Sequence, residues 1–209
     1  MAQTPALRSD AQANRRRLID AAHAVFAERG VNAEMKEIAE RAGVGVGTIY
    51  RNFATKEDLL LAIVQSLVEQ AEAIVRRAEV EPDPARAIHT LMDGAWEVAE
   101  ENAGLIRAMR SSSTTPPFDE LRAAAMDRSA LHESGLIDEH VADALDARTN
   151  RIFERAINAG VIRSGLTPEL LTAYFHAMFL IFVELRASCG PEVAAIGGKD
   201  VFFHGVLAP

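Results

Sequence analysis

The spacing of apolar residues constrains the fold of this chain most strongly. Apolar side chains between residues 11 and 29 recur at three- and four-residue intervals, with charged residues between them: Leu18, Ala21, Ala22, Val25 and Phe26. This interval places them on one face of a helix. The pattern stays helical along the rest of the 209 residues, and no segment alternates convincingly with a period of two. The chain is therefore predicted to be all-α, with about nine to ten helices.

Glycines, prolines and capping residues set the expected ends of these helices. The first helices are predicted over 11–29, 34–42, a short stretch after Gly45, and 55–80, with Gly30 and Gly43 as stop signals and Thr55 as an N-cap. The sequence EPDP at 81–84 then breaks the chain, and we expect a domain boundary near it. Further helices are expected near 84–101, 103–112, 117–134, 137–159, 167–188 and 199–207.

The distribution of charge decides whether a nucleic acid is a possible partner. The net charge of −8 argues against one for the chain as a whole. Residues 1–60, however, hold nine Lys/Arg and eight Asp/Glu, a net charge of +1, whereas residues 61–209 carry −9. A DNA-binding surface needs positive charge only where it faces phosphates. The N-terminal part therefore remains a candidate for DNA binding.

Cysteine content and hydrophobicity indicate a cytoplasmic protein. Cys189 is the only cysteine, so no disulfide can form within the chain. The first ten residues lack the apolar core of a secretory signal. The longest apolar run, within 170–183, is interrupted by Thr172 and His176 and is shorter than the roughly 20 residues that span a bilayer. No membrane partner is expected.

The segment GVGVGTIYRNF, residues 43–53, is rich in glycine, and two interpretations of it are open. A phosphate-binding loop needs a preceding strand and a following lysine, and neither is present. In the second interpretation, Gly43 adopts a positive φ, the chain bends, and a helix of about two turns follows, as in a helix-turn-helix. Val44 and Ile49 would then pack inward. The side chains that would point outward are Thr48, Tyr50, Arg51 and Asn52.

The sequence RRRLIDAAHAVFAERGVNAEMKEIAERAGVGVGTIYRNFATKEDLLLAIV resembles the DNA-binding region of the TetR (tetracycline repressor) family of bacterial regulators. Gly30, IAERAGV, GTIYRNF and KEDLL all fall at that family's intervals, and AGVIR and FFHGVL are weaker similarities later in the chain. The resemblance implies a flexible tail at 1–10, a helix-turn-helix domain at 11–56 with its motif at about 34–53, a connecting helix at 57–81, and an effector-binding and dimerisation domain at 82–209.

The resemblance also implies which residues contact double-stranded DNA. The positions that match base-facing ones are Val46, Gly47, Thr48 and Arg51, and those that match phosphate-binding ones are Lys36, Tyr50, Asn52 and Lys56. Arg51 is the first choice for a guanine reader. Two positions depart from the family, because Glu34 replaces a capping threonine and Gly45 replaces a common serine. Arg15, Arg16 and Arg17 would compensate for the lost hydroxyl groups, or form a solvated helix face.

The C-terminal helices are expected to form a homodimer that reads a palindromic operator. The segment TPELLTAYFHAMFLIFVELRAS is too apolar to be covered by one neighbouring helix. With KDVFFHGVL it could form a four-helix bundle with a second chain, so the predicted interface covers about 167–188 and 199–207. The alternative is that both helices belong to the core of a single chain.

A largely apolar small molecule is the expected effector. The candidate residues around it are His89, Met92, Trp96, Met109, Phe118, Met126, Phe153 and Phe175, with Glu97, Arg107 and His132 as further polar contacts. Each aromatic residue or methionine could equally be ordinary core. His89 with Asp93, and His132 with His140, lack a metal-binding motif, so neither metal nor cofactor is expected.

The sequence thus predicts a repressor that an unidentified ligand releases from DNA. A helical adaptor that does not bind DNA is one alternative. A small helical enzyme is the other, but no acid/base pair or nucleophile arrangement supports it, so no enzyme activity is expected.

Overall fold

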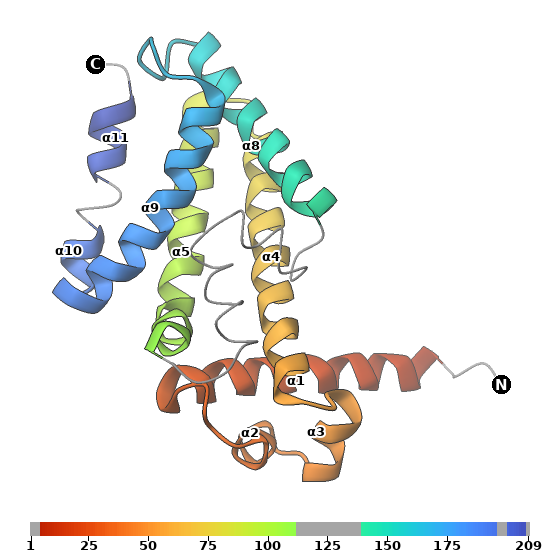
Figure 1. The fold of residues 1–209 in the computed structure, drawn as a ribbon. Helices are drawn as coiled ribbons and strands as arrows, with labels where there is room; N and C mark the ends of the chain where they lie inside the picture. The colour runs from red at the N-terminus through yellow and green to blue at the C-terminus, as the bar shows by residue number, and fades with distance from the viewer. Residues whose placement is uncertain (1–4, 112–138, 196–199, 208–209) are drawn as a thin grey trace. The chain divides into compact units, whose positions relative to one another are not determined.

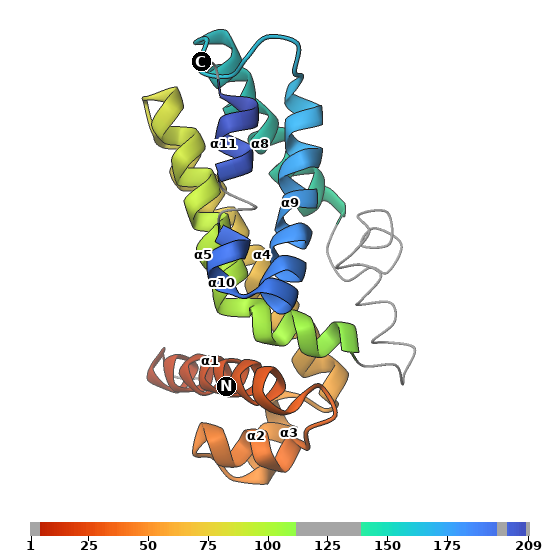
Figure 2. The ribbon, with the colours of Figure 1, turned by 90° about the vertical axis from the view of Figure 1, so that its left-hand side faces the viewer.

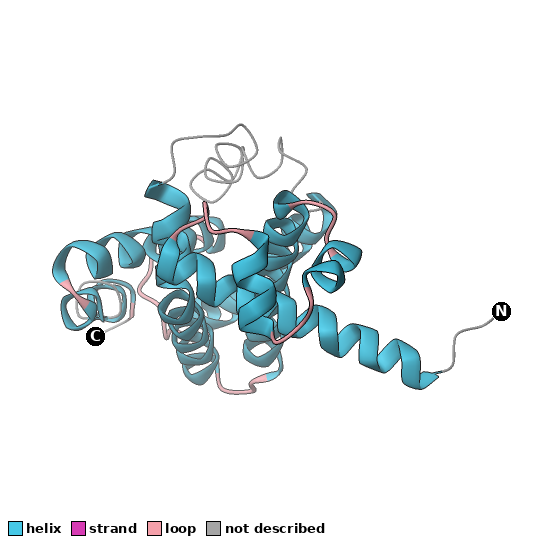
Figure 3. Ribbon diagram, turned by 90° about the horizontal axis from the view of Figure 1, so that it is seen from below, coloured by secondary structure: helices cyan, strands magenta, loops and turns pink. Residues whose placement is uncertain are grey.

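The structure is a computed structural model that describes residues 5–111, 139–195 and 200–207 (Figure 1). These residues form nine helices and no strand, which confirms the all-α prediction (Figure 3). The helices are α1 (Pro5–Arg29), α2 (Met35–Ala42), α3 (Val46–Asn52), α4 (Lys56–Val80), α5 (Pro84–Ser111), α8 (Glu139–Asn158), α9 (Pro168–Cys189), α10 (Pro191–Ala195) and α11 (Val201–Val206). An isolated bridge joins Ile162 to Leu207.

Contacts divide the chain into two compact units. The first consists of Met1–Ser66 with Gly104–Arg122, and the second of Leu67–Ala103 with Ala123–Pro209. Both divisions fall inside helices, so α4 and α5 each contribute residues to both units. Within the described residues, no helix has the length and hydrophobicity needed to cross a membrane.

The core of the first unit is built from one face of each of its helices. Leu18 and Phe26 of α1, Ile38 of α2, Ile49 of α3 and Leu59 of α4 are all fully buried. These residues include the apolar positions whose helical spacing predicted α1 and α2. Burial of large aliphatic and aromatic side chains supplies the main stabilisation of such a small helical unit.

Close contact between α1 and the end of α5 extends this core. A Cβ atom added to Gly104 would lie 2.9 Å from the Cβ of Ala27. Real Cβ atoms do not approach so closely, so glycine at this position lets the two helices touch along their backbones.

The second unit is organised around a cluster of buried residues from α4, α5, α8, α9 and α11. Its largest fully buried members include Ile88, Leu91, Met92, Phe153 and Phe202. Figure 2 shows α9 and α11 side by side in this unit, and the rings of Tyr174 and Phe202 stack with centroids 6.1 Å apart. The C-terminal helices therefore contribute one face to the core of their own chain.

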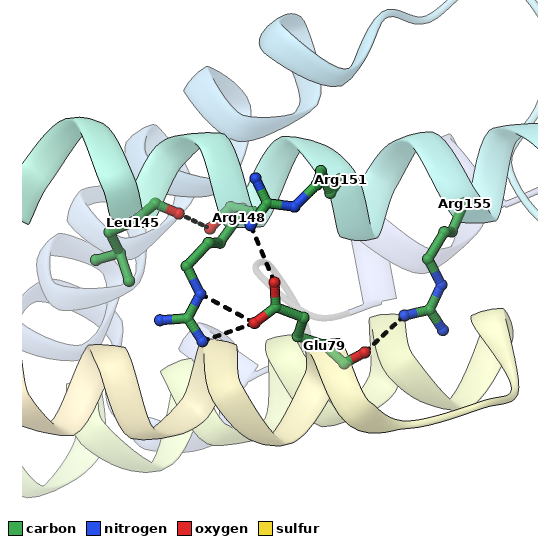
Figure 4. Close-up of polar contacts among 6 residues, drawn as sticks. Glu79, Leu145, Arg148, Arg151 and Arg155 are labelled. Carbon is green, nitrogen blue, oxygen red and sulfur yellow. Dashed lines mark hydrogen bonds and ion pairs between the residues drawn. The ribbon is translucent and has the colours of Figure 1, made fainter.

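A cluster of ion pairs joins α8 to the end of α4. Arg148 donates from Nη2 and Nε to one oxygen of Glu79, at 2.7 and 3.0 Å, and Arg151 donates to the other at 3.0 Å (Figure 4). Arg155 donates to the backbone carbonyl of Glu79 at 2.8 Å. The hydrogen bonds from Arg148 and then Arg151 lower the pKa of Glu79.

Two helices differ from their expected bounds. α1 begins at Pro5 rather than at residue 11, because proline fits the first turn of a helix and no helix breaker follows it before Gly30. α5 is continuous where an interruption near residue 102 was expected. Asn102 stays inside it because its side-chain amide donates to the carbonyl of Val98 at 2.7 Å.

The end of the chain holds a short helix, α10, that was not predicted. Pro191 follows Gly190 and starts a separate turn of helix between α9 and α11. Its five residues are too few to show a periodic pattern in the sequence. The helix expected at 117–134 lies outside the described residues.

Candidate nucleic-acid interface

The turn between α2 and α3 has the geometry that its glycines predicted. Gly43 has φ +66°, its N–H donates to the carbonyl of Glu40, and the N–H of Val44 donates to that of Ala39. A residue in the left-handed conformation commonly ends a helix with hydrogen bonds of this kind and changes the direction of the chain. α3 then begins after Gly45, whose carbonyl accepts from the N–H of Thr48 at 2.7 Å.

α3 is fixed by one buried face and exposes the other. Ile49, which was expected to pack inward, is fully buried, and Phe53, which follows the helix, is only 2% exposed. On the opposite face Tyr50 is 52% exposed and Val46 is 41% exposed. Such a short helix depends on its buried side for stability, so its exposed side is free to carry other functions.

Polar side chains on α3 are tied to the helix itself. Arg51 donates from Nε to the carbonyl of Gly47 at 3.0 Å and from Nη2 to the hydroxyl of Thr48 at 3.2 Å. Asn52 donates from its amide to the carbonyl of Thr48 at 2.8 Å. Arg51 is exposed, whereas Thr48 and Asn52 are half-buried. The structure thus brings these three predicted contact residues together on consecutive turns.

α2 begins after Glu34, at the position where the family that this sequence resembles usually has a threonine. The backbone N–H of Glu34 donates to the carboxylate of Glu37 at 2.9 Å, which satisfies a group that the helix start would leave unpaired. This hydrogen bond, together with the nearby Arg29 guanidinium, lowers the pKa of Glu37. The missing hydroxyl therefore does not leave the helix uncapped.

Thr55 and Asp58 cap the start of α4 reciprocally. The N–H of Asp58 donates to the hydroxyl of Thr55 at 3.1 Å, and the N–H of Thr55 donates to the carboxylate of Asp58 at 2.9 Å. The predicted N-cap is confirmed. The next residue, Lys56, donates from Nζ to the carbonyl of Val31 at 3.3 Å and so links the start of α4 to the turn between α1 and α2.

Basic side chains are also present on α1 and α2. Lys36 of α2 is exposed and lies 3.8 Å from the carboxylate of Glu40. Arg15 of α1 lies over the ring of Phe53, with its guanidinium carbon 4.5 Å from the ring centroid. Arg16 and Arg17 are exposed. The contact of Arg15 with Phe53 was not predicted, because no local pattern relates residues that lie 38 positions apart.

The predicted effector residues are only partly brought together. Met92, Trp96 and Phe175 line one void of about 10 Å³, which holds no more than a single water molecule. His89 lies elsewhere, exposed and stacked on Phe203 at 4.3 Å, and Phe153 is fully buried core. The side chain of Met109 and the residues Phe118, Met126 and His132 lie outside the described part of the structure, and Glu97 and Arg107 are exposed.

Apolar side chains are exposed on α9 and α11. Leu170 is 54%, Tyr174 37% and Ile181 47% exposed on α9, and Val201 of α11 is 56% exposed. We call these four residues the α9–α11 surface. A groove of about 270 Å³ lies between the two helices, and Arg163 is among the residues that line it. No group of three potential metal ligands occurs among the described residues.

Comparison with known proteins gives independent information on this arrangement. Residues 18–63 match the family described as bacterial regulatory proteins, tetR family. An HTH-type transcriptional regulator of Staphylococcus aureus (strain USA300) is 45% identical over 60 residues, which are 28% of this chain and 32% of that protein. The chain thus matches about a third of the length of the curated relatives.

Two solved structures share the wider fold. SmeT in complex with triclosan is 20% identical, with a TM-score of 0.65 over 94% of this chain and 92% of its own. A TetR transcription regulatory protein from Mycobacterium vanbaalenii is 26% identical, with a TM-score of 0.58 over 87% of this chain and 97% of its own. With α1 to α3 in this geometry, residues 18–63 of the chain are similar in sequence and in fold to the DNA-binding part of the TetR family of bacterial regulatory proteins.

Proposed function

We propose that this protein is a cytoplasmic DNA-binding transcriptional regulator, a homodimeric repressor that leaves its operator when a small molecule binds. The observation that carries this proposal is the presentation of α3, which exposes Val46, Tyr50 and Arg51 while Ile49 and Phe53 fix the helix from behind. A short helix held in this way after a tight turn is suited to enter the major groove. We assign the chain a binding role and no catalytic one.

The two faces around α3 would have different roles on DNA. Lys36, Tyr50, Asn52 and Lys56 would bind phosphates and so set the position of the protein, and the exposed residues of α3 would face the bases. Gly47 supports this division. A Cβ added there would meet no atom within 4 Å, and its φ is not positive, so neither packing nor backbone requires glycine. A glycine at this place leaves room for the DNA surface.

The α9–α11 surface would be the dimer interface. Leu170, Tyr174 and Ile181 follow one another along α9 at helical spacing, and Val201 extends the patch onto α11. Contiguous exposed apolar patches on soluble proteins mark interaction sites. A twofold axis through this patch would pair each helix with its own copy. Each dimer would then carry two copies of α3, as a palindromic operator requires.

The effector would enter the second unit beside Met92, Trp96 and Phe175. SmeT, which shares the fold, forms a complex with the small molecule triclosan, and this supports a small-molecule effector here. Because the present void is only about 10 Å³, binding requires these side chains to rearrange. Met92 can adjust in this way because methionine is unbranched and has three rotatable bonds.

Ligand binding would be coupled to DNA binding through α4, which contributes residues to both units. A ligand that favours one packing of the second unit shifts the population away from the DNA-binding state. A hundredfold loss of operator affinity corresponds to roughly 2.7 kcal/mol of coupling, within the usual range for allosteric proteins.

Selection from random duplex DNA tests the proposal. Purified full-length protein should enrich an inverted repeat, and its affinity for that repeat should fall steeply with added salt because bound counterions are released. If a stable dimer enriched no sequence and bound no duplex DNA, the regulator assignment would be wrong and an adaptor role would be favoured.

A further inference from the structure

Arg51 uses only one edge of its guanidinium within the protein. Its Nε–H donates to the carbonyl of Gly47, and an N–H of Nη2 donates to the hydroxyl of Thr48. In arginine, Nε–H and the adjacent N–H of Nη2 lie on the same side of the planar group. The carbonyl of Gly47 and the hydroxyl of Thr48 therefore hold this edge of the Arg51 guanidinium against α3.

The outer edge of the Arg51 guanidinium still has N–H donors that can bind another molecule. The outer N–H groups of Nη1 and Nη2 form a second fork, and none of the described contacts of Arg51 uses Nη1. Arg51 is exposed on the same helix as Tyr50 and Val46. A fork of two parallel donors matches the O6 and N7 acceptors that guanine presents in the major groove.

We propose that Thr48 is a positioning residue, which holds the side edge of Arg51 so that the outer edge reads one guanine in each half-site of the operator. This inference rests on the proposed function. It gives Thr48 a role through Arg51, in addition to the contact with bases that the family resemblance implies for it.

Two physical effects make such positioning useful. An arginine already held on its helix loses less conformational freedom when it binds, so more of the contact energy remains as affinity. It also cannot swing freely to a phosphate, where its contact would carry no sequence information. At the same position adenine presents N7 beside an amino group, which would face a donor of the fixed fork. The arrangement therefore favours specificity for guanine over general affinity.

Parallel selections from random duplex DNA test the proposal with four full-length proteins: the natural chain, Thr48→Val, Thr48→Ser and Arg51→Ala. Valine has the shape of threonine but no hydroxyl, whereas serine keeps the acceptor. The natural chain should prefer guanine at one position of each half-site by about 5- to 150-fold, the range of a good bidentate contact. Arg51→Ala should lose the preference at that position alone.

The two threonine variants separate positioning from a merely structural role. Thr48→Val should reduce the guanine preference by about 5-fold or more and leave unchanged the positions of the half-site that Thr48 does not itself face, and Thr48→Ser should keep the preference. Thermal unfolding of each variant shows whether the fold is kept. If Thr48→Val unfolds, Thr48→Ala, which also lacks the hydroxyl and favours a helix, takes its place in the comparison with Thr48→Ser.

A modified base tests the contact itself. Replacing the preferred guanine by 7-deazaguanine removes the N7 acceptor, which should weaken binding of the natural chain and have a smaller effect on Thr48→Val. Full guanine preference in Thr48→Val, or in Arg51→Ala, would overturn the positioning role while leaving the regulator assignment intact. Failure of the natural chain to enrich any site would instead overturn the proposed function, and this inference with it.

Discussion

The exposed face of α3 and the α9–α11 surface differ in how far contacts within a single chain satisfy their exposed side chains. On α3, the polar side chains of exposed Arg51 and half-buried Asn52 donate hydrogen bonds to their own helix. On the α9–α11 surface the exposed side chains of Leu170, Ile181 and Val201 are apolar. The exposed face of α3 is compatible with water without a partner. The α9–α11 surface is instead stabilised when another apolar surface covers it, because apolar side chains are then removed from water.

The two surfaces also differ in where the information for their function lies. The form of α3 follows from local sequence, through a positive φ at Gly43 and buried anchors at Ile49 and Phe53. In the proposed dimer, the role of the α9–α11 surface depends on a second molecule. A mutation should therefore affect one surface and spare the other.

The largest effect is expected from charges placed on the α9–α11 surface. The double variant Leu170→Glu, Ile181→Glu should convert the dimer to monomers, because a twofold axis brings like charges together and burial desolvates them. Affinity for an inverted repeat should fall at least about 1,000-fold, since one α3 contacts too few bases. Light scattering and gel shift measure the two effects.

Val80→Glu is the matched control for that variant. Val80 is 76% exposed and lies at the end of α4, outside the α9–α11 surface. It should leave both the mass of the assembly and the affinity for DNA unchanged. A double variant that stayed dimeric would show that the interface lies elsewhere.

The next effect concerns α3 alone. Tyr50→Ala should reduce operator affinity about 100-fold, because a contact is lost in each of two half-sites. Gel filtration should show an intact dimer. Tyr174→Ala is the corresponding change on the other surface, and it should weaken the dimer first. Unchanged affinity of Tyr50→Ala for DNA would refute its assignment as a contact residue.

A smaller effect is expected where α8 joins α4. Glu79→Gln should lower the free energy of unfolding by about 1 kcal/mol at neutral pH, because it weakens the partly exposed pairs with Arg148 and Arg151. The folded-state pKa of Glu79 lies below its ordinary value of 4.5. The stabilisation is therefore present above that value and is lost as the pH falls through the folded-state pKa.

Denaturant titrations of both proteins from pH 7 to pH 3 measure this difference. The two stabilities should converge at the acidic end. A gap of constant size across the whole range would mean that packing of the side chain, rather than its charge, causes the loss.

The smallest expected effect is an increase in the free energy of unfolding. Gly45→Ser should raise stability by a few tenths of a kcal/mol, because Gly45 is the N-cap of α3 with φ −69°, which serine adopts without strain. A hydroxyl there would also be available to DNA. Gly43→Ser is the control and should instead cost about 1 kcal/mol, because φ +66° is unfavourable for a residue with a side chain. Thermal unfolding distinguishes the two.

The N-terminal helices were predictable because each depends on neighbours in the sequence. The turn at Gly43, the cap at Thr55 and the buried side of α3 follow from short-range rules of backbone and capping chemistry. The early start of α1 at Pro5 and the continuity of α5 at Asn102 were missed. In both places a residue that commonly ends or precedes a helix is accommodated by its position in the turn or by a hydrogen bond along the helix.

The site residues of the second unit could not be assigned from sequence to the same extent. An apolar residue at helical spacing looks the same whether it is core, pocket wall or interface. Phe153 is core, Met92 and Trp96 border a void, and Tyr174 is exposed, although all lie in similar patterns. Long-range contacts such as Arg15 on Phe53 and Arg148 on Glu79 depend on the fold and leave no local signal.

The stoichiometry and footprint of the natural protein on its selected DNA test the paired presentation of α3 most directly. We expect two chains per duplex and two protected half-sites in inverted orientation, with centres about one helical turn, roughly 34–36 Å, or a multiple of it apart. Hydroxyl-radical footprinting together with the mass of the complex measures both quantities. A single chain bound at one undivided site would contradict binding as a symmetric dimer.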